Sequence, residues 1–503
     1  MSIVATAPVL VPLATAGLTA MVAGRTRLQQ AVSFAGALGF LAAAVALMAQ
    51  VSAGVPASVS FGDWALPYGI QFQLDGLSSV LVLVTALMGL ASLIYLASDA
   101  DPGPRHPLLL PLVHGTLTGV AGAFSTADLF NLYVWFEVML MSSFVLVSLG
   151  GERAQLQGAL KYVVLNLVSS ALFLAGAGLL YGSIGTLNMA DAAVALRELP
   201  AQGLPSVVAS LFLLAFGIKA AAFPLFFWLP ASYHTPPMPV AALFAGLLTK
   251  VGVYALVRVL TLVFVRDTAF TGPLLLAVAA LTMVTGVLGA MAQGDVRKIL
   301  SFHIVSQIGY MLMGLGLGTR LALAGTVFYV LHHIVVKANL FLVAGAMRRA
   351  GGSFSLDRLG SLLARSPLLA AAFLVPAVSL AGLPPLSGFW AKYLLVRAGL
   401  EAGNGTIVAV ALAVSLLTLF SMTKIWNEAF WKPAPAGAGA APAPLTPGER
   451  ASLLGPVLVL GAITVAIGLG AGVLYRFADA AAAQLLDPEL YVRAVLGARG
   501  GGG

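Results

Sequence analysis

The sequence contains no cysteine, which excludes disulfide bonds, thiolate catalysis, Cys-ligated zinc and Cys-ligated iron–sulfur clusters. Charged residues are scarce as well, at 9% of the chain, whereas soluble domains carry roughly a quarter. Hydrophobic residues make up 60% of the 503 positions, and the mean hydropathy is +1.00. This balance predicts an integral membrane protein embedded in the lipid bilayer rather than a soluble one.

Sequence motifs for metal and nucleotide sites are missing too. The chain has no HExxH, no GxxxxGKS/T, and no GxGxxG that follows a strand. We therefore expect no metal site, no other cofactor and no ATP-driven pump. The net charge of +8 lies largely in short loops between apolar runs or inside those runs, so it indicates membrane topology and no nucleic-acid partner.

Apolar runs of about 20 residues, enough to cross a bilayer, recur along the whole chain. The first run has no basic leader, so we expect it to be a span and not a cleaved signal. We predict an all-α polytopic membrane protein with about fourteen transmembrane helices. The predicted spans are 4–23, 30–52, 74–98, 108–124, 128–149, 157–182, 205–229, 237–258, 272–293, 299–317, 321–346, 366–400, 404–430 and 451–475. The twelfth is too long for one straight crossing.

Loop charges predict the orientation, because basic residues collect on the cytoplasmic side. With the N-terminus outside, the inside loops hold Arg25, Arg27, Arg105, Arg153, Arg297, Lys298, Arg348, Arg349, Arg358, Arg365, Lys432 and Arg450. The outside loops then hold fewer, namely Arg197, Arg258, Arg266, Arg320, Arg397, Arg476, Arg493 and Arg499. This asymmetry places both termini outside. We expect 433–447 to be a flexible Ala/Pro/Gly linker, 186–205 a loop or short surface helix, and the glycine-rich end a disordered tail.

Two proline-containing stretches predict broken helices and an internal repeat. Pro224 begins PLFFW shortly after Lys219, and Pro384 and Pro385 begin PPLSGFW just before Lys392. Proline removes an amide donor, and the freed carbonyls at bilayer depth must face protein or water. Because the two stretches lie five spans apart, successive five-helix units would have opposite topology. We predict two inverted five-helix repeats with broken helices 7 and 12.

This repeat defines the expected organisation of a single membrane domain over 1–503. Residues 1–107 would hold helices 1–3, 108–258 the first repeat, and 272–430 the second. The last helix would cover 451–475 and a C-terminal tail 476–503.

Ionisable residues inside the apolar runs are the candidate functional groups, because a charge at bilayer depth is costly and by default indicates an ion or proton pathway. Among the acids, Asp75, Asp128 and Glu428 fall near span ends, whereas Glu137 falls well inside. A lysine partner would keep this carboxylate charged. The buried bases are Lys219, Lys250, Lys337 and Lys392, joined by His332 and His333. Together these groups predict a line across the membrane, and we expect Glu137 and Lys219 to gate it.

Structural readings compete with this interpretation. A single lysine near a span end usually reaches out to the interface, which suits Lys161 and Lys298 and is an alternative for Lys392. The paired histidines could be packing donors. Lys424 and Glu428 lie four residues apart and are expected to form a local ion pair.

The motifs around these residues resemble a known family. FEVMLMSSFVLVSL, FGIKAAAFPLFFWLPASYHTPPMPVAALFAGLLTKVGVYAL, GDVRKILSFHIVSQIGYM and SLAGLPPLSGFWAKYLL are similar to the antiporter-like subunits that Mrp-type cation/proton antiporters share with respiratory complex I. The lysine in the twelfth span and the WLPASYHTPPMPV turn most resemble the D branch of the Mrp subunits.

The resemblance implies fourteen spans and a central polar axis. Within that axis it implies that Glu137 and Lys219 gate, that Lys250 relays, that His332 and Lys337 link the halves, and that Lys392 is the outlet. The expected function is proton translocation in a multi-subunit Na+/H+ antiporter of the bacterial cell membrane, with partner subunits A, B, C, E, F and G. Protons are the expected transported ion and sodium the second candidate.

Two alternatives stay open on the sequence. The runner-up is a proton-pumping membrane subunit of a respiratory NADH:quinone oxidoreductase, which would use the same residues and would be distinguished by flavin and iron–sulfur subunits encoded nearby. The third is a scaffold whose buried charges do nothing, and there the removal of charge would be silent.

Overall fold

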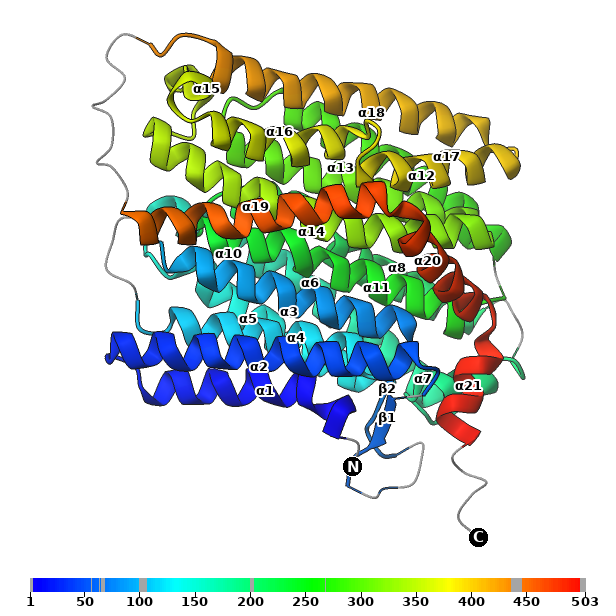
Figure 1. The fold of residues 1–503 in the computed structure, drawn as a ribbon. Helices are drawn as coiled ribbons and strands as arrows, with labels where there is room; N and C mark the ends of the chain where they lie inside the picture. The colour runs from blue at the N-terminus through cyan, green and yellow to red at the C-terminus, as the bar shows by residue number, and fades with distance from the viewer. Residues whose placement is uncertain are drawn as a thin grey trace.

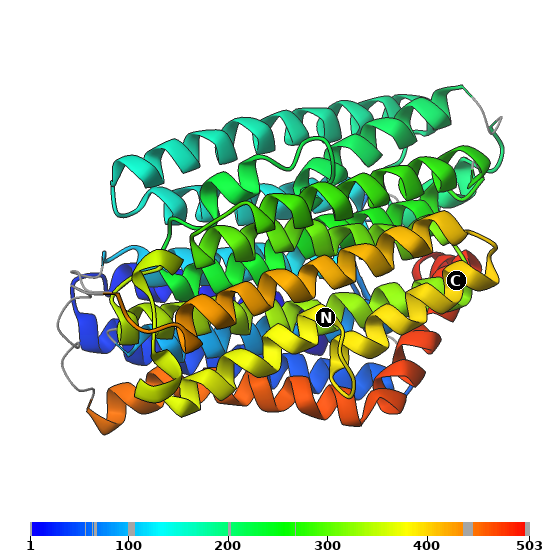
Figure 2. The same cartoon turned by 90° about the horizontal axis from the view of Figure 1, so that it is seen from above.

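The protein is a bundle of long helices that lie side by side (Figures 1 and 2). The structure is a computed structural model, and it describes residues 3–55, 57–62, 64, 68–98, 106–199, 203–266, 268–435 and 446–497. Arg105, Arg499, the centre of the 433–447 linker and the end of the glycine-rich tail lie outside the described residues, so the expectations for them stay predictions.

The first half of the bundle contains a short hairpin and eleven helical segments. Its elements are α1 (Ile3–Met21), α2 (Thr26–Ser52), β1 (Ala57–Ser60), β2 (Gln71–Leu74), α3 (Gly76–Leu96), α4 (Leu109–Ser125), α5 (Leu129–Ser148), α6 (Arg153–Ile184), α7 (Met189–Ala195), α8 (Leu204–Ala220), α9 (Trp228–Ser232), α10 (Met238–Leu243) and α11 (Thr249–Arg258). The π-helical turn Phe244–Leu248 joins α10 to α11, and a second π-helical turn, Val259–Val263, extends the same continuous helix.

The second half is entirely helical over the described residues. Its elements are α12 (Thr268–Met291), α13 (Val296–Leu317), α14 (Arg320–Gly351), a 3-10 turn (Leu356–Arg358), α15 (Leu362–Arg365), α16 (Pro367–Ala381), α17 (Ser387–Glu401), α18 (Gly405–Trp426), a π-helical turn (Asn427–Trp431), α19 (Pro447–Leu469), α20 (Ala471–Leu486) and α21 (Pro488–Leu496).

The prediction of an all-α membrane protein is confirmed. Within the described residues, eleven helices are long and apolar enough to cross a membrane, and α4, α8 and α16 are shorter apolar helices. Each predicted span overlaps one of these helices, and the broken twelfth overlaps α17 as well as α16. The count of fourteen crossings stays a prediction. The last predicted span ends too late, because α19 stops at Leu469 and the chain turns away into α20 (Figure 1).

The seventh and twelfth crossings are both interrupted near their middle. Helix α8 ends at Ala220, and helical structure resumes only at Trp228, so the chain is non-helical around Pro224. Helix α16 ends at Ala381, and α17 begins at Ser387, beyond Pro384 and Pro385. Each interruption leaves the last carbonyls of a half-helix without partners in that helix.

Several features recur in the two halves in the same register. Helices α6 and α14 both have 32 residues. Asp128 caps α5, and its backbone forms an isolated β-bridge with Asn188 beyond α6. In the second half Asp295 caps α13, and its backbone forms an isolated β-bridge with Ser355 beyond α14. The two repeats over 108–258 and 272–430 stay a prediction, which these equivalences support.

One end of the bundle carries elements that the sequence analysis missed. The antiparallel β1–β2 hairpin lies at this end, and α20 and α21 cross the same end beside α7 (Figure 1). Helix α7 lies within 186–205, where a loop or a short surface helix was expected. Arg320 pairs with Asp479 of α20 at 2.5 Å, and Arg197 beyond α7 pairs with Glu489 of α21. These ion pairs fasten the C-terminal helices across the hairpin end.

Arg258 is not a loop charge, contrary to the orientation analysis. It is buried, and its guanidinium lies 2.8 Å from the Asp75 carboxylate. The rings of Tyr254 and Tyr491 lie 5.3 and 5.0 Å from the guanidinium carbon, so α21 covers the pair. Burial raises the pKa of Asp75, which precedes α3, but the Arg258 charge together with hydrogen bonds from Arg258 and Ser78 holds this pKa below its ordinary value.

The expected ion pair between Lys424 and Glu428 is wrong. The Lys424 ammonium instead donates to the carbonyls of Met291 and Gln293, at 3.1 and 2.8 Å, and Glu428 pairs with Lys432 at 2.8 Å. The end of α12 explains this choice, because its last carbonyls have no partner in their own helix and attract a nearby cation.

Replacement of Asp75 tests the buried ion pair. Asp75→Asn keeps the helix cap but leaves Arg258 buried without a counter-charge, which we expect to lower the free energy of unfolding in detergent by about 3–5 kcal/mol. The matched control is Glu401→Gln, which breaks the exposed Arg397–Glu401 pair and should cost less than about 1 kcal/mol. Equal effects of the two substitutions would contradict a structural role for the buried pair.

Candidate functional site

The first part of the candidate site joins three helices through one serine. Ser170 of α6 donates its hydroxyl hydrogen bond to Glu137 of α5 at 2.5 Å and accepts one from the Lys219 ammonium of α8 at 3.1 Å. Lys219 also lies 5.0 Å from the centre of the Phe136 ring. Among the described residues, Glu137 and Lys219 form no direct ion pair. The predicted gating pair is therefore connected through a third residue.

The position of Lys219 follows from the break in its helix. It occupies the last turn of α8, where the unpaired carbonyls and the helix dipole stabilise a cation. Lys219 is 3% exposed, whereas Glu137 is only half-buried. The acid thus lies closer to the surface of the bundle than the base.

Lys250 is fully buried and is held by a local irregularity of its own helix. Its ammonium donates to the carbonyl of Ala245, at 2.5 Å, within the π-helical turn Phe244–Leu248. A π-turn interrupts the regular i to i−4 bonding, and such turns are frequent at functional sites. Gly252, two residues later, packs against the backbone at Lys219: a Cβ there would lie 2.6 Å from the Ala220 nitrogen. This close approach places α11 directly beside the end of α8.

Helix α14 contributes the central groups, and they face different neighbours. The Lys337 ammonium donates to the carbonyl of Leu300 in α13 at 2.9 Å. His332 bonds the hydroxyl of Ser387, at 2.8 Å, at the start of α17. Neither ring nitrogen of His333 has a hydrogen-bond partner among the described residues, although the ring is buried. His332 therefore belongs to the second helix break, and Lys337 to the α13–α14 interface.

Lys392 lies at the second break in an arrangement related to that of Lys219. Its ammonium donates to the carbonyl of Ala381, the last residue of α16, at 3.0 Å and to Ser415 of α18 at 2.9 Å. The Tyr310 ring centre lies 5.0 Å away. Lys392 is 6% exposed, so the alternative in which it reaches the surface is wrong.

Several buried polar groups near the charged residues were missed by the sequence analysis. Ser170 joins Glu137 and Lys219, Ser387 bonds His332, and Ser415 bonds Lys392. Ser379 and His303 bond the hydroxyls of Ser387 and Ser421, at 3.0 and 2.9 Å. Serine is common in apolar helices and carries no charge, so composition does not single it out. A repeated sequence pattern could have drawn attention to Ser170. The pattern Thr-Gly-Val-x-Gly-Ala occurs at 118–123 and again at 285–290, and an alignment of the two halves on it places Ser170 opposite Lys337.

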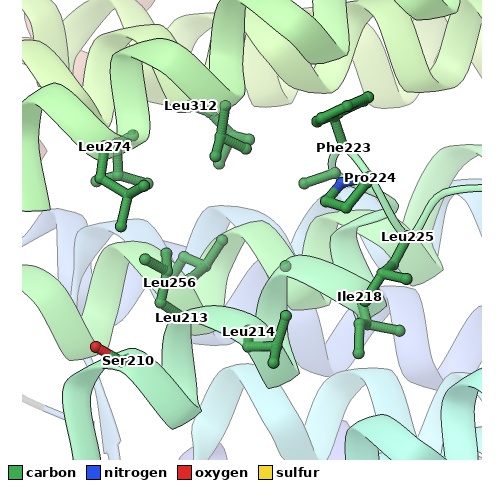
Figure 3. Close-up of a pocket in the computed structure, with 14 residues that line it drawn as sticks. Ser210, Leu213, Leu214, Ile218, Phe223, Pro224, Leu225, Leu256, Leu274 and Leu312 are labelled. Carbon is green, nitrogen blue, oxygen red and sulfur yellow. The ribbon is translucent and has the colours of Figure 1, made fainter. Parts of the chain in front are cut away.

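A cavity of about 230 Å³ lies beside the first break, on the side of α8 that faces away from Ser170. Figure 3 shows its lining by Pro224 and by leucines of α8, α11, α12 and α13. Ser210 supplies the one hydroxyl of this lining. An apolar cavity offers no hydrogen-bonded route, and the hydrogen bond of Lys219 lies toward α6 instead.

No cluster of three or more histidine, aspartate or glutamate side chains that could hold a metal ion occurs in the part of the chain that the structure describes. The site is instead a set of single bases, of which the four lysines and His332 each bond a carbonyl or a hydroxyl. This arrangement suits the passage of a proton between neighbouring groups, and it defines the class as a polytopic membrane protein with a buried line of titratable residues.

Comparison with known proteins identifies the family. Residues 126–418 match the family described as NADH:quinone oxidoreductase/Mrp antiporter, transmembrane. The D subunits of the Na(+)/H(+) antiporters of Alkalihalophilus pseudofirmus and Bacillus subtilis are 43% and 40% identical, and each match covers 97% of this chain and 98% of the relative. The chain belongs to this family of antiporter-like membrane subunits.

Solved structures give the same relationship. A chain of the Mrp complex from a Dietzia species superimposes with a TM-score of 0.91 at 36% identity, over 99% of this chain and 100% of that one. A chain of respiratory complex I from Thermus thermophilus superimposes with a TM-score of 0.82 at 26% identity, over 96% and 100%. The fold is therefore shared by both branches of the family.

Glycine-to-alanine substitutions test the contact between α8 and α11. Gly252→Ala would push a methyl group into the backbone at Lys219, and we expect a loss of about 1–3 kcal/mol in the free energy of unfolding. Gly178→Ala, at an exposed position of α6 with nothing within 4 Å, should stabilise the protein by up to about 1 kcal/mol. Effects of the same sign at both positions would contradict the close approach.

Proposed function

We propose that the chain is the proton-translocating subunit of a multi-subunit Mrp-type Na+/H+ antiporter. The complex would exchange cytoplasmic Na+ for external H+, driven by the proton-motive force. The observation that carries the proposal is the set of four buried lysines, each bonded to a carbonyl or hydroxyl, in a chain 43% identical to the D subunit of an Na+/H+ antiporter. The sodium route is assigned to no residue of this chain.

The proton path would follow the order of the contacts. Glu137 and Lys219 stand at one end, and Lys250 follows through the tight contact between α8 and α11. Lys337 links α13 and α14, and His332 leads to the second break, where Lys392 forms the outlet. A buried ammonium is costly, so its neutral form is accessible and each lysine can exchange protons with its neighbours.

The gate would be the acid–base pair at the first break. A negative Glu137 favours a charged Lys219, whereas a protonated Glu137 removes that stabilisation and favours release of the lysine's proton toward Lys250. The half-buried position of Glu137 supports this assignment, because the acid can respond to what lies outside the bundle while the lysine cannot.

We also propose the cellular setting. The complex would lie in the bacterial cell membrane with this chain as a multi-pass subunit, both termini outside, and subunits A, B, C, E, F and G as partners. The similar Dietzia chain belongs to an Mrp complex, which supports assembly with other subunits. The loop charges support the orientation, since the inside loops hold more basic residues than the outside loops. The difference grows when Arg258 is left out of the outside set, because it lies in a buried ion pair.

The second candidate is a proton-pumping subunit of a respiratory NADH:quinone oxidoreductase. The complex I chain with a TM-score of 0.82 favours it, since the fold and the lysine line suit either machine. Sequence identity favours the antiporter, at 43% and 40% against 26%. Quinone-dependent electron transfer that co-purifies with this chain would overturn the antiporter assignment.

Removal of the gate charges tests the proposed function. In everted vesicles that hold the whole complex, Glu137→Gln and Lys219→Ala should each lower sodium-dependent dissipation of a pH gradient by about a hundredfold, the usual scale for loss of a proton-transfer group. Lys161→Ala, at an exposed site on α6, is the control and should transport normally. Normal exchange in the gate variants, with assembly intact, would leave only the scaffold alternative.

A further inference from the structure

Ser170 departs from the usual behaviour of a hydroxyl inside an apolar helix. Buried serine and threonine side chains commonly bond the carbonyl four residues earlier in their own helix. Thr85, Ser125 and Thr418 do so in this protein, at 2.7–2.8 Å. Ser170, which is 4% exposed, instead donates to the Glu137 carboxylate on another helix. Its proton is thus committed to a partner that can accept it.

The neighbouring serine shows that this choice is specific. Ser169 is fully buried on the same helix and donates to the carbonyl of Ala215 in α8, at 2.7 Å. That bond joins two helices but touches no titratable group. The two adjacent serines therefore have different partners, one a backbone carbonyl and the other an acid and a base.

The direction of the hydrogen bonds forms an unbroken donor chain. Lys219 Nζ donates to Ser170 Oγ at 3.1 Å, and Ser170 Oγ donates to Glu137 Oε1 at 2.5 Å. A hydroxyl can accept from one neighbour while it donates to another, which neither a carbonyl nor a methyl group can do. Because Glu137 and Lys219 form no direct contact, a proton exchanged between them along these hydrogen bonds passes through this hydroxyl.

The place of Ser170 in the fold agrees with such a role. When the equally long helices α6 and α14 are aligned on their first residues, Arg153 and Arg320, Ser170 falls opposite Lys337. Lys337 is a buried base that bonds across to the neighbouring helix. The same position along the two helices therefore carries a proton-active group in both halves.

We propose that the Ser170 hydroxyl is a proton relay between Lys219 and Glu137. In the transfer step a protonated Glu137 gives its Oε1 proton to Ser170 Oγ as the Ser170 hydroxyl proton moves to the neutral Lys219 amine. The result is a charged lysine, an intact serine and an ionised glutamate, so charge and protons balance, and the three groups then have the donor order that the structure shows. Rotation of the hydroxyl toward its own helix would break the chain and close the gate.

This inference rests on the proposed proton path, and variants at positions 169 and 170 test it separately. In everted vesicles with the whole complex, Ser170→Ala should lower the maximal rate of sodium-dependent proton exchange by at least about tenfold, as expected when a proton-transfer group is lost. The sodium concentration at half-maximal rate should stay unchanged, because Ser170 handles the proton. Ser170→Thr, which restores a hydroxyl, should recover the rate.

Ser169→Ala is the matched control, since it removes a buried hydroxyl from the adjacent position. It should keep the wild-type rate. Full activity of Ser170→Ala in a complex where Glu137→Gln and Lys219→Ala are inactive would overturn the relay and leave the proton path standing. Equal losses in Ser170→Ala, Ser170→Thr and Ser169→Ala would also overturn it, because they would reveal a packing effect. If the Glu137 and Lys219 variants were themselves active, the proposed function would fail first.

Discussion

The arrangement of the bundle depends on one constraint, the cost of an ammonium group in a water-poor interior. An isolated charge there is unstable unless it is paired or strongly hydrogen-bonded. The protein meets this constraint with backbone carbonyls that regular helices would have used. Lys219 lies in the last turn of α8, Lys392 bonds the last carbonyl of α16, and Lys250 bonds a carbonyl within a π-turn. These three irregularities of the backbone therefore lie where a base has to be solvated.

This dependence explains why the sequence revealed the charged residues well. A lysine in an apolar run is conspicuous, and so is a proline that breaks such a run. The locations of Lys219, Lys392 and the two interruptions could therefore be predicted from single positions. Their roles in proton transfer stay predictions.

The missed features share a different property, because each depends on contacts between distant parts of the chain. Ser170 matters through neighbours on two other helices, and nothing in its own helix marks it. Arg258 resembles a loop charge in the sequence because its partner, Asp75, lies far away along the chain. The expected Lys424–Glu428 pair is wrong for the same reason, since local spacing ignores the carbonyls that a neighbouring helix offers. The two strands are short, and α20 and α21 are short helices that each carry charged residues, so none of them forms an apolar run long enough to stand out.

The ring of Tyr491 over Arg258 has a consequence for biosynthesis. Asp75 and Arg258 are made and inserted well before α21 leaves the ribosome, because chains fold from the N-terminus during synthesis. Until then the face of the guanidinium that the Tyr491 ring covers, and the ends of the helices beside it, remain uncovered. Residues of α21, translated after both partners, thus complete a contact between the first and the middle parts of the chain, and a nascent polypeptide truncated before them would display an unfinished surface.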